Sequence, residues 1–435
     1  MSCFLPVSRC LICLGLVISS LGVQAAPARK SAKPVAEPVS GSIEVELGHQ
    51  LGEDKGEALR KLVERFNAQS PNGKVVVSDR RWGQGSLPHM TIVSEQDEDL
   101  FLDGKPRYKP LWQVMKASGL ALPVSAPPKV MVPASVDGAN RLVALPVALS
   151  SPVVFYNKGL LDKLGVGAAE VPKTWRAWVS VLGRVHTQGV SCPMTVSQPV
   201  FTLFENAAVW NNQPMTIVGK NEQFAANGLM HVKHLAMMTS WVKSGYLRYF
   251  GRGAEAEEQF ASGKCGVIVA PSGSYPSLVR QAGFQVGVAP YPYHDDAYGA
   301  PLHTLADGPS LWVANNKTPA EYKLVARFIQ FWLQADNQDQ WQVEAGYLPL
   351  SRTGLPAVTQ AALLKNETAA NRQVLAQLNN KPATRLSAAT AFSHRIGVRR
   401  ILAEEMEQVF ADKKPPKQGL DDAVQRIQQK AGGRL

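Results

Sequence analysis

Residues 142–158 read LVALPVALSSPVVFYNK, and the rest of the chain is organised around this stretch. It contains two short apolar runs rich in valine, which are typical of buried strands. Pro146 interrupts the first run, and Ser150 and Ser151 separate it from the second. A buried hydroxyl group needs a hydrogen-bond partner, so a polar break is unusual inside a core. The pattern indicates that the chain crosses here between two lobes, with the serines facing a cleft.

The length of 435 residues exceeds what one ordinary hydrophobic core needs, and it favours two lobes. The formal net charge is +11, but the lysine and arginine residues are dispersed along the chain. Without a concentrated basic block, nucleic-acid binding gains little support. A mildly basic surface suits an anionic small ligand equally well.

Residues 1–25 have the features of a secretory signal peptide. Arg9 precedes an apolar run at residues 11–23, and a small-residue cleavage pattern follows it. Residues 26–42 are rich in Pro, Ala, Lys and Ser, which predicts a flexible tether. The apolar run is too short to span a membrane. We therefore expect an exported protein without a membrane-spanning segment.

Cysteine usage agrees with export. Cys3, Cys10 and Cys13 lie in the signal segment, so only Cys192 and Cys265 remain in the mature chain. An even number of cysteines in an oxidising compartment predicts one disulfide between them. The alternative is two separate buried thiols.

Apolar periodicity predicts alternating strands and helices along the mature chain. A helix at residues 57–67 lies between strands at 43–47 and 75–77, which implies a parallel sheet. Further strands are expected at residues 90–93, 266–270, 284–289 and 310–314, and further helices at 174–186, 201–210, 229–242 and 320–333. Short apolar segments lie at residues 111–115 and 130–132, and the chain after residue 356 is mostly helical in pattern. The helix at 174–186 is expected to bury Trp175, Trp178, Val179, Leu182 and Val185.

The sequence contains no P-loop, no HExxH, no GxSxG and no GxGxxG motif. His231 and His234 are three residues apart and could both face a metal ion, but no third ligand is evident, so a packed or solvated pair is favoured. Tyr293, His294, Asp295 and Asp296 follow a proline, where a surface turn is favoured. We therefore expect no metal, no cofactor and no catalytic residue.

Several polar groups lie at strand ends and breaks. Residues 272–274 read SGS at a helix start, where free backbone N–H groups favour an anion, although an ordinary helix cap explains them equally well. Gly308 precedes a strand, and Tyr347 follows a glycine. The acidic residues 95–99 are expected to be a solvated helix start. Together these groups predict a binder of a small polar ligand.

A longer series of segments, in a fixed order, is more specific than any single pattern. It comprises GHQLGEDKGEALRKLVERFNAQSP, SSPVVFYNKGLLDKLG, VPKTW, VSCP, FENAAVWN, VKHLAM, FASGKCGVIVAPSGS, DGPSLWV, AGYLPL and RIGVRRILAEEMEQVF. With this series, nearly all of the mature chain resembles the extracellular solute-binding proteins of ABC importers, of the maltose-binding-like type. Within that family it is most similar to the binders of glycerol phosphate.

The resemblance implies an α/β fold of the type II periplasmic binding-protein class, in which each lobe is a mostly parallel sheet flanked by helices and ligand binds between the lobes. It assigns residues 43–147 and 304–345 to lobe I, and residues 148–303 and 346–435 to lobe II. The crossings would lie near residues 147–151, 303–308 and 346–348. The two mature cysteines fall where the glycerol-phosphate binders also have cysteines, which supports the disulfide.

The resemblance also implies ligand contacts. Ser150, Gly308 and Tyr347 match ligand residues of the family. Arg399 matches the arginine expected to hold the phosphate, a role that suits the planar, permanently charged guanidinium group. Glu95 matches a glutamate expected at the ligand's hydroxyl groups, which removes it from the solvated acidic run.

Three positions depart from the family pattern. Pro271 stands where the family has a serine, so Ser272 is expected to substitute for it. Gln198 aligns with a ligand-facing tryptophan, so one aromatic wall is lost. The segment near residue 82 is shortened, and Trp82 is expected to take the place of a ligand tyrosine. The resemblance thus implies that the part of the site that binds the ligand's anionic group is retained, and that the part that binds its glycerol is altered.

The function implied is that of a monomeric periplasmic substrate-binding subunit of an ABC importer. Its ligand would be sn-glycerol-3-phosphate, a related glycerophosphodiester or another phosphorylated polyol. It would deliver the ligand to a permease heterodimer with a cytoplasmic ATPase, and it would carry out no chemistry. The open alternatives are a binder of a neutral sugar or oligosaccharide, an exported hydrolase, and a scaffold or sensor that has lost transport.

Overall fold

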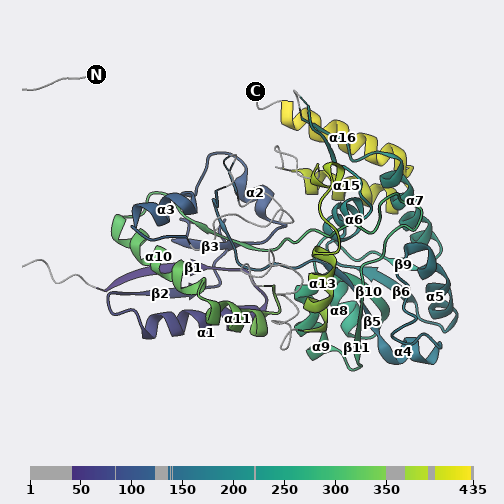
Figure 1. The fold of residues 1–435 in the computed structure, drawn as a ribbon, viewed down its shortest axis with the longest axis horizontal. Coiled ribbons are helices and arrows are strands. Elements are labelled where there is room, and N and C mark those ends of the chain that lie inside the picture. The colour runs from purple at the N-terminus through teal and green to yellow at the C-terminus, as the bar shows by residue number, and fades with distance from the viewer. Residues whose placement is uncertain are drawn as a thin grey trace, which may run out of the picture. The chain divides into compact units, whose positions relative to one another are not determined.

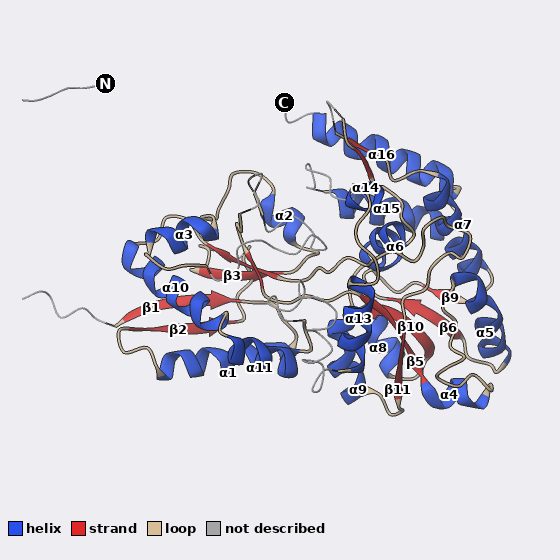
Figure 2. Cartoon of the chain, in the orientation of Figure 1, coloured by secondary structure: helices blue, strands red, loops and turns tan. Residues whose placement is uncertain are grey.

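The computed structural model describes residues 42–83, 85–122, 136–137, 139, 141–219, 222–348, 368–389 and 397–432. The expected signal peptide, nearly all of the tether and the apolar segment at 130–132 lie outside these residues. By its internal contacts, Ser42–Leu435 is one unit. Within it, helices flank two five-stranded sheets (Figures 1 and 2).

The first sheet has the strand order β2-β1-β3-β12-β4. β1 is parallel to β2 and β3, whereas β12 is antiparallel to β3 and β4, so one strand opposes the other four. Its strands are β1 (Ile43–Gly48), β2 (Gly73–Ser78), β3 (Met90–Val93), β4 (Leu145–Pro146) and β12 (Ser310–Val313). The helices between and after these strands are α1 (Glu53–Ala68), α2 (Glu98–Leu102), α3 (Leu111–Ala117), α10 (Pro319–Trp332) and α11 (Ala335–Ala345).

The second sheet has the order β11-β5-β10-β6-β9. β5 is antiparallel to β10 and β11, and the other pairs are parallel, so again one strand opposes four. Its strands are β5 (Pro152–Asn157), β6 (Cys192–Val196), β9 (Leu247–Arg248), β10 (Cys265–Pro271) and β11 (Val286–Ala289). Both sheets are therefore mostly parallel, as predicted. A small antiparallel pair, β7 (Thr216–Ile217) and β8 (Gln223–Phe224), lies outside them.

The helices of this second part begin with α4 and continue to the end of the described chain. They are α4 (Lys158–Lys163), α5 (Trp175–Thr187), the π-helix η2 (Val200–Glu205), α6 (Asn206–Trp210), α7 (Leu229–Lys243), α8 (Glu255–Ala261), the 3₁₀ turn η3 (Ser272–Ser274), α9 (Tyr275–Gln281), α13 (Ala369–Leu378), α14 (Arg385–Ala388), α15 (Val398–Phe410) and α16 (Pro416–Gly432). The strands and helices expected from the sequence within the described residues all form. None of the described helices has both the length and the apolar character needed to cross a bilayer.

The apolar stripe of α5 was predicted correctly except at one position. Trp175, Trp178, Leu182 and Val185 are buried, but Val179 is 39% exposed. Val179 is four residues after Trp175, but the buried face is centred near Trp178 and Val185, and Val179 lies about 100° around the helix axis from that centre. Val181, three residues after Trp178, is buried instead.

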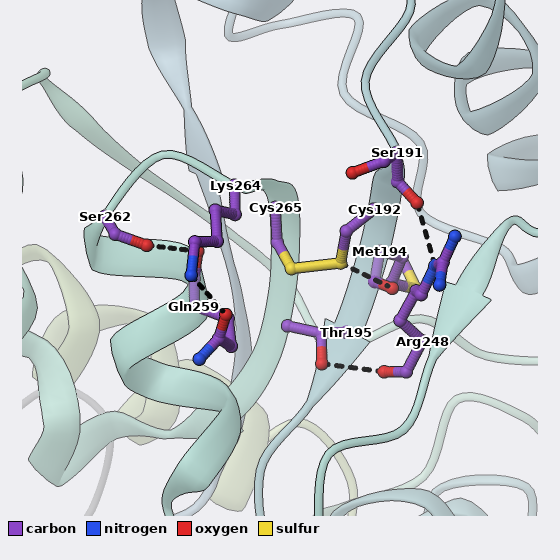
Figure 3. Close-up of a disulfide and its surroundings, with 9 residues drawn as sticks. All are labelled: Ser191, Cys192, Met194, Thr195, Arg248, Gln259, Ser262, Lys264 and Cys265. Atoms are coloured by element: carbon purple, nitrogen blue, oxygen red, sulfur yellow. Dashed lines mark hydrogen bonds between the residues drawn. A yellow bond between two sulfur atoms is a disulfide. The ribbon is translucent and has the colours of Figure 1, made fainter.

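The two mature cysteines form the predicted disulfide (Figure 3). Cys192 begins β6 and Cys265 begins β10, and the parallel register of these neighbouring strands pairs the two residues directly. Their Cα atoms are 4.5 Å apart. The bond therefore joins two adjacent strands at their starts.

The chain passes between the two sheets at the stretch quoted first. β4 belongs to the first sheet and β5 to the second, so residues 147–151 connect the sheets. The chain returns between β11 of the second sheet and β12 of the first. β5 and β12, the strands that run opposite to the other four in their sheets, directly follow these connections.

Candidate functional site

Three segments that are distant in the sequence lie side by side at the connections between the sheets. Ser150 forms an antiparallel bridge with Asp307, through N–H to O=C hydrogen bonds of 2.9 and 3.0 Å. Leu149 bridges Leu348 in the same way, and the Leu348 N–H donates to its carbonyl at 2.8 Å. Residues 147–151, 303–309 and 346–348 therefore meet as neighbours, which is where the resemblance placed the crossings.

Gly308 is held closely against the first of these segments. A Cβ atom at this position would lie 1.7 Å from the carbonyl oxygen of Ala148. Such a distance is far inside van der Waals contact, so only glycine fits here. The Asp307 carboxylate accepts a hydrogen bond of 2.8 Å from the Gly308 N–H.

Tyr347 reaches the same corner from the third segment. Gly346 has φ +78° and ends α11, which turns the chain sharply before the tyrosine. The tyrosine ring lies against Gly273, where a Cβ atom would come within 2.6 Å of a ring carbon and 3.5 Å of the Cβ of Ser150. The glycine of the SGS segment thus admits the ring, and Ser150, Gly273 and Tyr347 share one corner.

The serine hydroxyl groups of the SGS segment are used inside the protein. The Ser272 hydroxyl accepts a hydrogen bond from the Ser151 N–H at 3.4 Å, and its own N–H donates to the Ser151 carbonyl at 2.9 Å. The Ser274 hydroxyl donates to the Glu257 carboxylate at 2.7 Å. All three residues of the segment are buried. Ser272 therefore lies at the corner, and its ligand role stays a prediction.

Arg399, in the first turn of α15, is held by two carboxylates that the sequence reading did not identify. Its Nε and Nη2 donate to Glu205 at 2.8 and 2.6 Å, and Nη2 also lies 2.5 Å from an Asp307 carboxylate oxygen. The three side chains are only 11–16% exposed. Burial by itself would lower the pKa of Arg399, but Asp307 and Glu205 outweigh it and leave that pKa well above its ordinary value.

Glu95 differs from the acidic residues that follow it in the burial of one carboxylate oxygen. One of its carboxylate oxygens is buried and has no hydrogen-bond partner in the described part of the chain. Burial, and then the charge of Asp307, raise the pKa of Glu95, while Arg399 and Lys55 act in the opposite direction. α2 begins only at Glu98, three residues later. The buried, unpartnered oxygen makes Glu95 a candidate ligand contact.

Glu95 and Arg399 line a single cavity of about 260 Å³. It lies between the segment before and within α2, the segment around η2, and α15. Its lining residues are Glu95, Gln96, Asp97, Asp99, Leu100, Gln198, Pro199, Val200, Phe201, Arg252, Arg399, Arg400 and Ala403. Gln198, the position where the resemblance implies a lost aromatic wall, is therefore part of the lining. The Asp307–Arg399 ion pair links this cavity to the corner of Ser150 and Tyr347.

Lys55 is a further residue that the sequence reading missed. It lies in the first turn of α1, and its Nζ is 4.7 Å from the centroid of the Tyr347 ring. Burial acts to lower the pKa of Lys55, but Tyr347, Glu257 and Glu95 outweigh it and raise that pKa. The lysine is therefore firmly charged, and it stands at the same corner.

Trp82 is not brought together with the other predicted residues. Its ring packs edge-on against Phe101 at 5.4 Å, and the guanidinium of Arg107 lies 4.9 Å from the ring centroid. Trp82 packs against a small apolar cluster that contains Phe101 and Trp312. The contacts assign Trp82 to packing at the first sheet, and its ligand role stays a prediction.

The histidines considered as metal ligands form a packed group. His231 and His234 are buried on α7, as favoured, but His294 is also buried, so the expected surface turn was wrong at that residue. The turn folds inward because a His294 ring nitrogen lies 3.0 Å from one of His234, and the His294 N–H donates to Asn211 at 2.7 Å. Among the described residues, no group of three or more His, Cys, Asp or Glu side chains is arranged to hold a metal ion.

Comparison with known proteins shows which family this chain belongs to. The family model for bacterial extracellular solute-binding proteins matches residues 61–371. The sn-glycerol-3-phosphate-binding periplasmic protein UgpB of Pectobacterium atrosepticum is 28% identical over 442 residues, which cover 95% of this chain and 93% of that protein.

Two solved structures show the same fold at low sequence identity. UgpB from Mycobacterium tuberculosis in complex with glycerophosphocholine has a TM-score of 0.70 at 18% identity, covering 91% of this chain and 99% of that one. The cyclic alpha-maltosyl-1,6-maltose binding protein of Arthrobacter globiformis has a TM-score of 0.67 at 18% identity, covering 90% and 99%. The two sheets with their flanking helices are thus the type II periplasmic binding-protein fold, as predicted. With the family model matched over most of its length, the chain belongs to the bacterial extracellular solute-binding proteins.

Proposed function

We propose that the protein is the substrate-binding subunit of an ABC importer, and that it captures sn-glycerol-3-phosphate, a related glycerophosphodiester or another phosphorylated polyol. The observation that carries this proposal is the meeting of Ser150, Gly308 and Tyr347 at one corner. That corner is joined through Asp307 to a cavity lined by Glu95 and Arg399. Curated relatives named for sn-glycerol-3-phosphate binding support the ligand class.

In this proposal, residues 43–147 and 304–345 form lobe I, and residues 148–303 and 346–435 form lobe II. A ligand that touches groups of both lobes stabilises the state in which the lobes are closed on it. Glu95 would contact the ligand from lobe I, and Ser150, Tyr347 and Arg399 from lobe II. The connecting segments would act as the hinge.

The groups at the corner suit a polar, oxygen-rich ligand. The Ser150 hydroxyl and the Tyr347 phenol can donate or accept hydrogen bonds. The buried oxygen of Glu95 lacks a partner and can accept a hydrogen bond from a ligand hydroxyl group. The subunit would act in the periplasm as a monomer and dock on a permease heterodimer with its ATPase. The names of the curated relatives, which describe periplasmic proteins, support this location.

A neutral sugar or oligosaccharide is the second candidate ligand. It is favoured by the pairing of Arg399 with two carboxylates, which leaves less positive charge for a phosphate than the sequence suggested. Structural relatives at comparable TM-scores include a binder of a cyclic oligosaccharide. A thermal-shift screen with organophosphates and neutral sugars distinguishes these two ligand classes.

The test is a thermal-shift screen of the mature protein, followed by calorimetry on the hits. A ligand that binds only the folded state adds about 2.7 kcal/mol to the free energy of unfolding at 100 times its dissociation constant. We expect at least one of sn-glycerol-3-phosphate, a glycerophosphodiester or a sugar phosphate to raise the melting temperature, while maltose and other neutral sugars leave it unchanged. A response to neutral sugars alone would assign the site to carbohydrate, and turnover of a phosphodiester with added metal would assign a hydrolase.

A further inference from the structure

Lys55 is a cation that, among the described residues, is stabilised by several surrounding groups and not by contact with one carboxylate. It lies in the first turn of α1, where the positive end of the helix dipole disfavours positive charge. The side chain is only partly exposed, and its Nζ lies over the Tyr347 ring rather than in water. A partly buried charge is costly without a compensating partner. Solubility alone therefore does not explain why a lysine stands at this position.

Several other lysines are paired directly with carboxylates. Lys74 contacts Glu44 at 3.0 Å, and Lys414 contacts both Glu405 and Asp422 at 2.7 Å. Lys55 has no carboxylate oxygen within 4.0 Å among the described residues. Glu257, the carboxylate near it, accepts hydrogen bonds from Ser197 and Ser274 at 2.8 and 2.7 Å. Lys55 is thus a charged group at the ligand corner without a direct anionic partner.

Arg399 is in the opposite situation. Glu205 forms a bidentate ion pair with Arg399, and Asp307 adds a second carboxylate at 2.5 Å. The Glu205 pair uses Nε and Nη2, the Asp307 contact uses Nη2, and two negative charges face one positive charge. A phosphate group arriving at Arg399 would have to displace or approach Asp307, and like charges at contact distance repel.

We propose that Lys55, rather than Arg399, holds the anionic group of the ligand, and that Asp307 keeps Arg399 occupied so that the site prefers a singly charged anion to a dianionic phosphate monoester. This inference rests on the proposed function. Its geometric basis is the corner shared by Lys55, Tyr347, Gly273 and Ser150. A phosphodiester carries one negative charge, which one ammonium group balances.

The preference for one charge follows from the remaining carboxylates. The charge of Asp307 raises the pKa of Glu95, and Glu95 also interacts with Lys55. Arg252 and Arg400 also line the cavity, but they do not change its charge balance. Arg252 pairs with Glu407, and Arg400 pairs with Glu404. A second negative charge on the ligand would meet Glu95 and Asp307, and within the described residues the arginines that line the cavity are already paired with carboxylates.

The experiment is calorimetry of the full mature protein at pH 7.5 with two probes, glycerophosphocholine and sn-glycerol-3-phosphate. Lys55→Met keeps the length of the side chain and removes its charge. We expect it to weaken binding of the diester by at least about tenfold, the loss of one charge-assisted contact. Lys55→Arg, which restores the charge, is expected to recover most of that loss.

Lys109→Met is the matched control, because Lys109 also lies over a tyrosine ring, that of Tyr322, at 4.2 Å. It should leave both affinities within about twofold. Asp307→Asn releases one carboxylate from Arg399, and we expect it to improve binding of the monoester relative to the diester by at least about tenfold.

The possible results distinguish failure of the roles given to Lys55 and Asp307 from failure of the proposed function. Diester binding that survives Lys55→Met unchanged overturns the role of Lys55 and leaves the proposed function standing. A monoester-to-diester ratio that Asp307→Asn does not change overturns the role of Asp307. If neither probe nor any other organophosphate binds the wild-type protein, the proposed function fails, and the assignment of Lys55 fails with it.

Discussion

Removal of the Arg399 side chain should destabilise the folded protein as well as alter binding. In the structure the guanidinium neutralises Glu205 and Asp307, whose side chains are 11% and 13% exposed. The substitution therefore leaves two nearly buried carboxylates without the guanidinium group that pairs with both of them.

The magnitude follows from burial. Breaking a buried ion pair by removing one partner costs about 3–5 kcal/mol, because the remaining charge is left uncompensated. Arg252 provides a matched comparison, since it engages Glu407 with the same two-pronged geometry at 2.7 and 2.5 Å but is 42% exposed. For such an exposed pair the loss should stay within about 1 kcal/mol.

The assay is urea unfolding at pH 7.5 followed by tryptophan fluorescence, with Arg399→Ala and Arg252→Ala measured in parallel. Lowering the pH should shrink the deficit of Arg399→Ala, because protonation of either orphaned carboxylate removes a nearly buried negative charge. The triple variant Arg399→Met, Glu205→Gln, Asp307→Asn should regain much of the lost stability. Equal losses of less than 1 kcal/mol for the two single variants would refute this account of Arg399.

Three further predictions concern stability. Cys192→Ala with Cys265→Ala opens a loop spanning 73 residues and should lower the free energy of unfolding by about 4 kcal/mol, measured by urea titration; a change below 1 kcal/mol would contradict the entropic argument. Burial lowers the pKa of His231 and of His294 to about 4, whereas the unfolded chain takes up these protons near pH 6.5. Stability should therefore be fully present above pH 6.5 and fall as the pH drops toward 4, by up to about 3 kcal/mol for each histidine, and His231→Gln should flatten this slope in urea titrations at several pH values. Gly308→Ala forces a Cβ atom against the Ala148 carbonyl and should cost about 2–4 kcal/mol by chemical denaturation, while Gly83→Ala, in open space, should cost less than about 1 kcal/mol.

Local patterns in the sequence were sufficient for the elements of the fold. The apolar runs at β5 and β10 are buried along nearly their whole length, so their composition alone marks them as central strands. The break at Ser150 and Ser151 also carried real information, because the chain changes sheets there. Each of these features depends on residues adjacent in the sequence, and such features can be read without knowing the fold.

The candidate site was only partly predictable because its ionic pairing is long-range. Arg399 and Glu205 are 194 residues apart, and no local pattern indicates that they meet. Asp307 lies in the segment before Gly308, where no local pattern indicates that it pairs with Arg399. His294 looked like part of a surface turn, because its burial depends on His234 from a different helix. The resemblance supplied positions for ligand contacts, but it could not show that this chain surrounds Arg399 with carboxylates.

The most direct test of the central claim is a crystal structure of the mature protein with the tightest organophosphate found in the screen. The account predicts one ligand at the corner of Ser150, Gly308 and Tyr347, with its phosphate within hydrogen-bond distance of Lys55 and with the Asp307–Arg399 pair intact. A phosphate bound directly to Arg399 with Asp307 displaced would contradict the assignment of Lys55. A ligand bound away from this corner would contradict the proposed site as a whole.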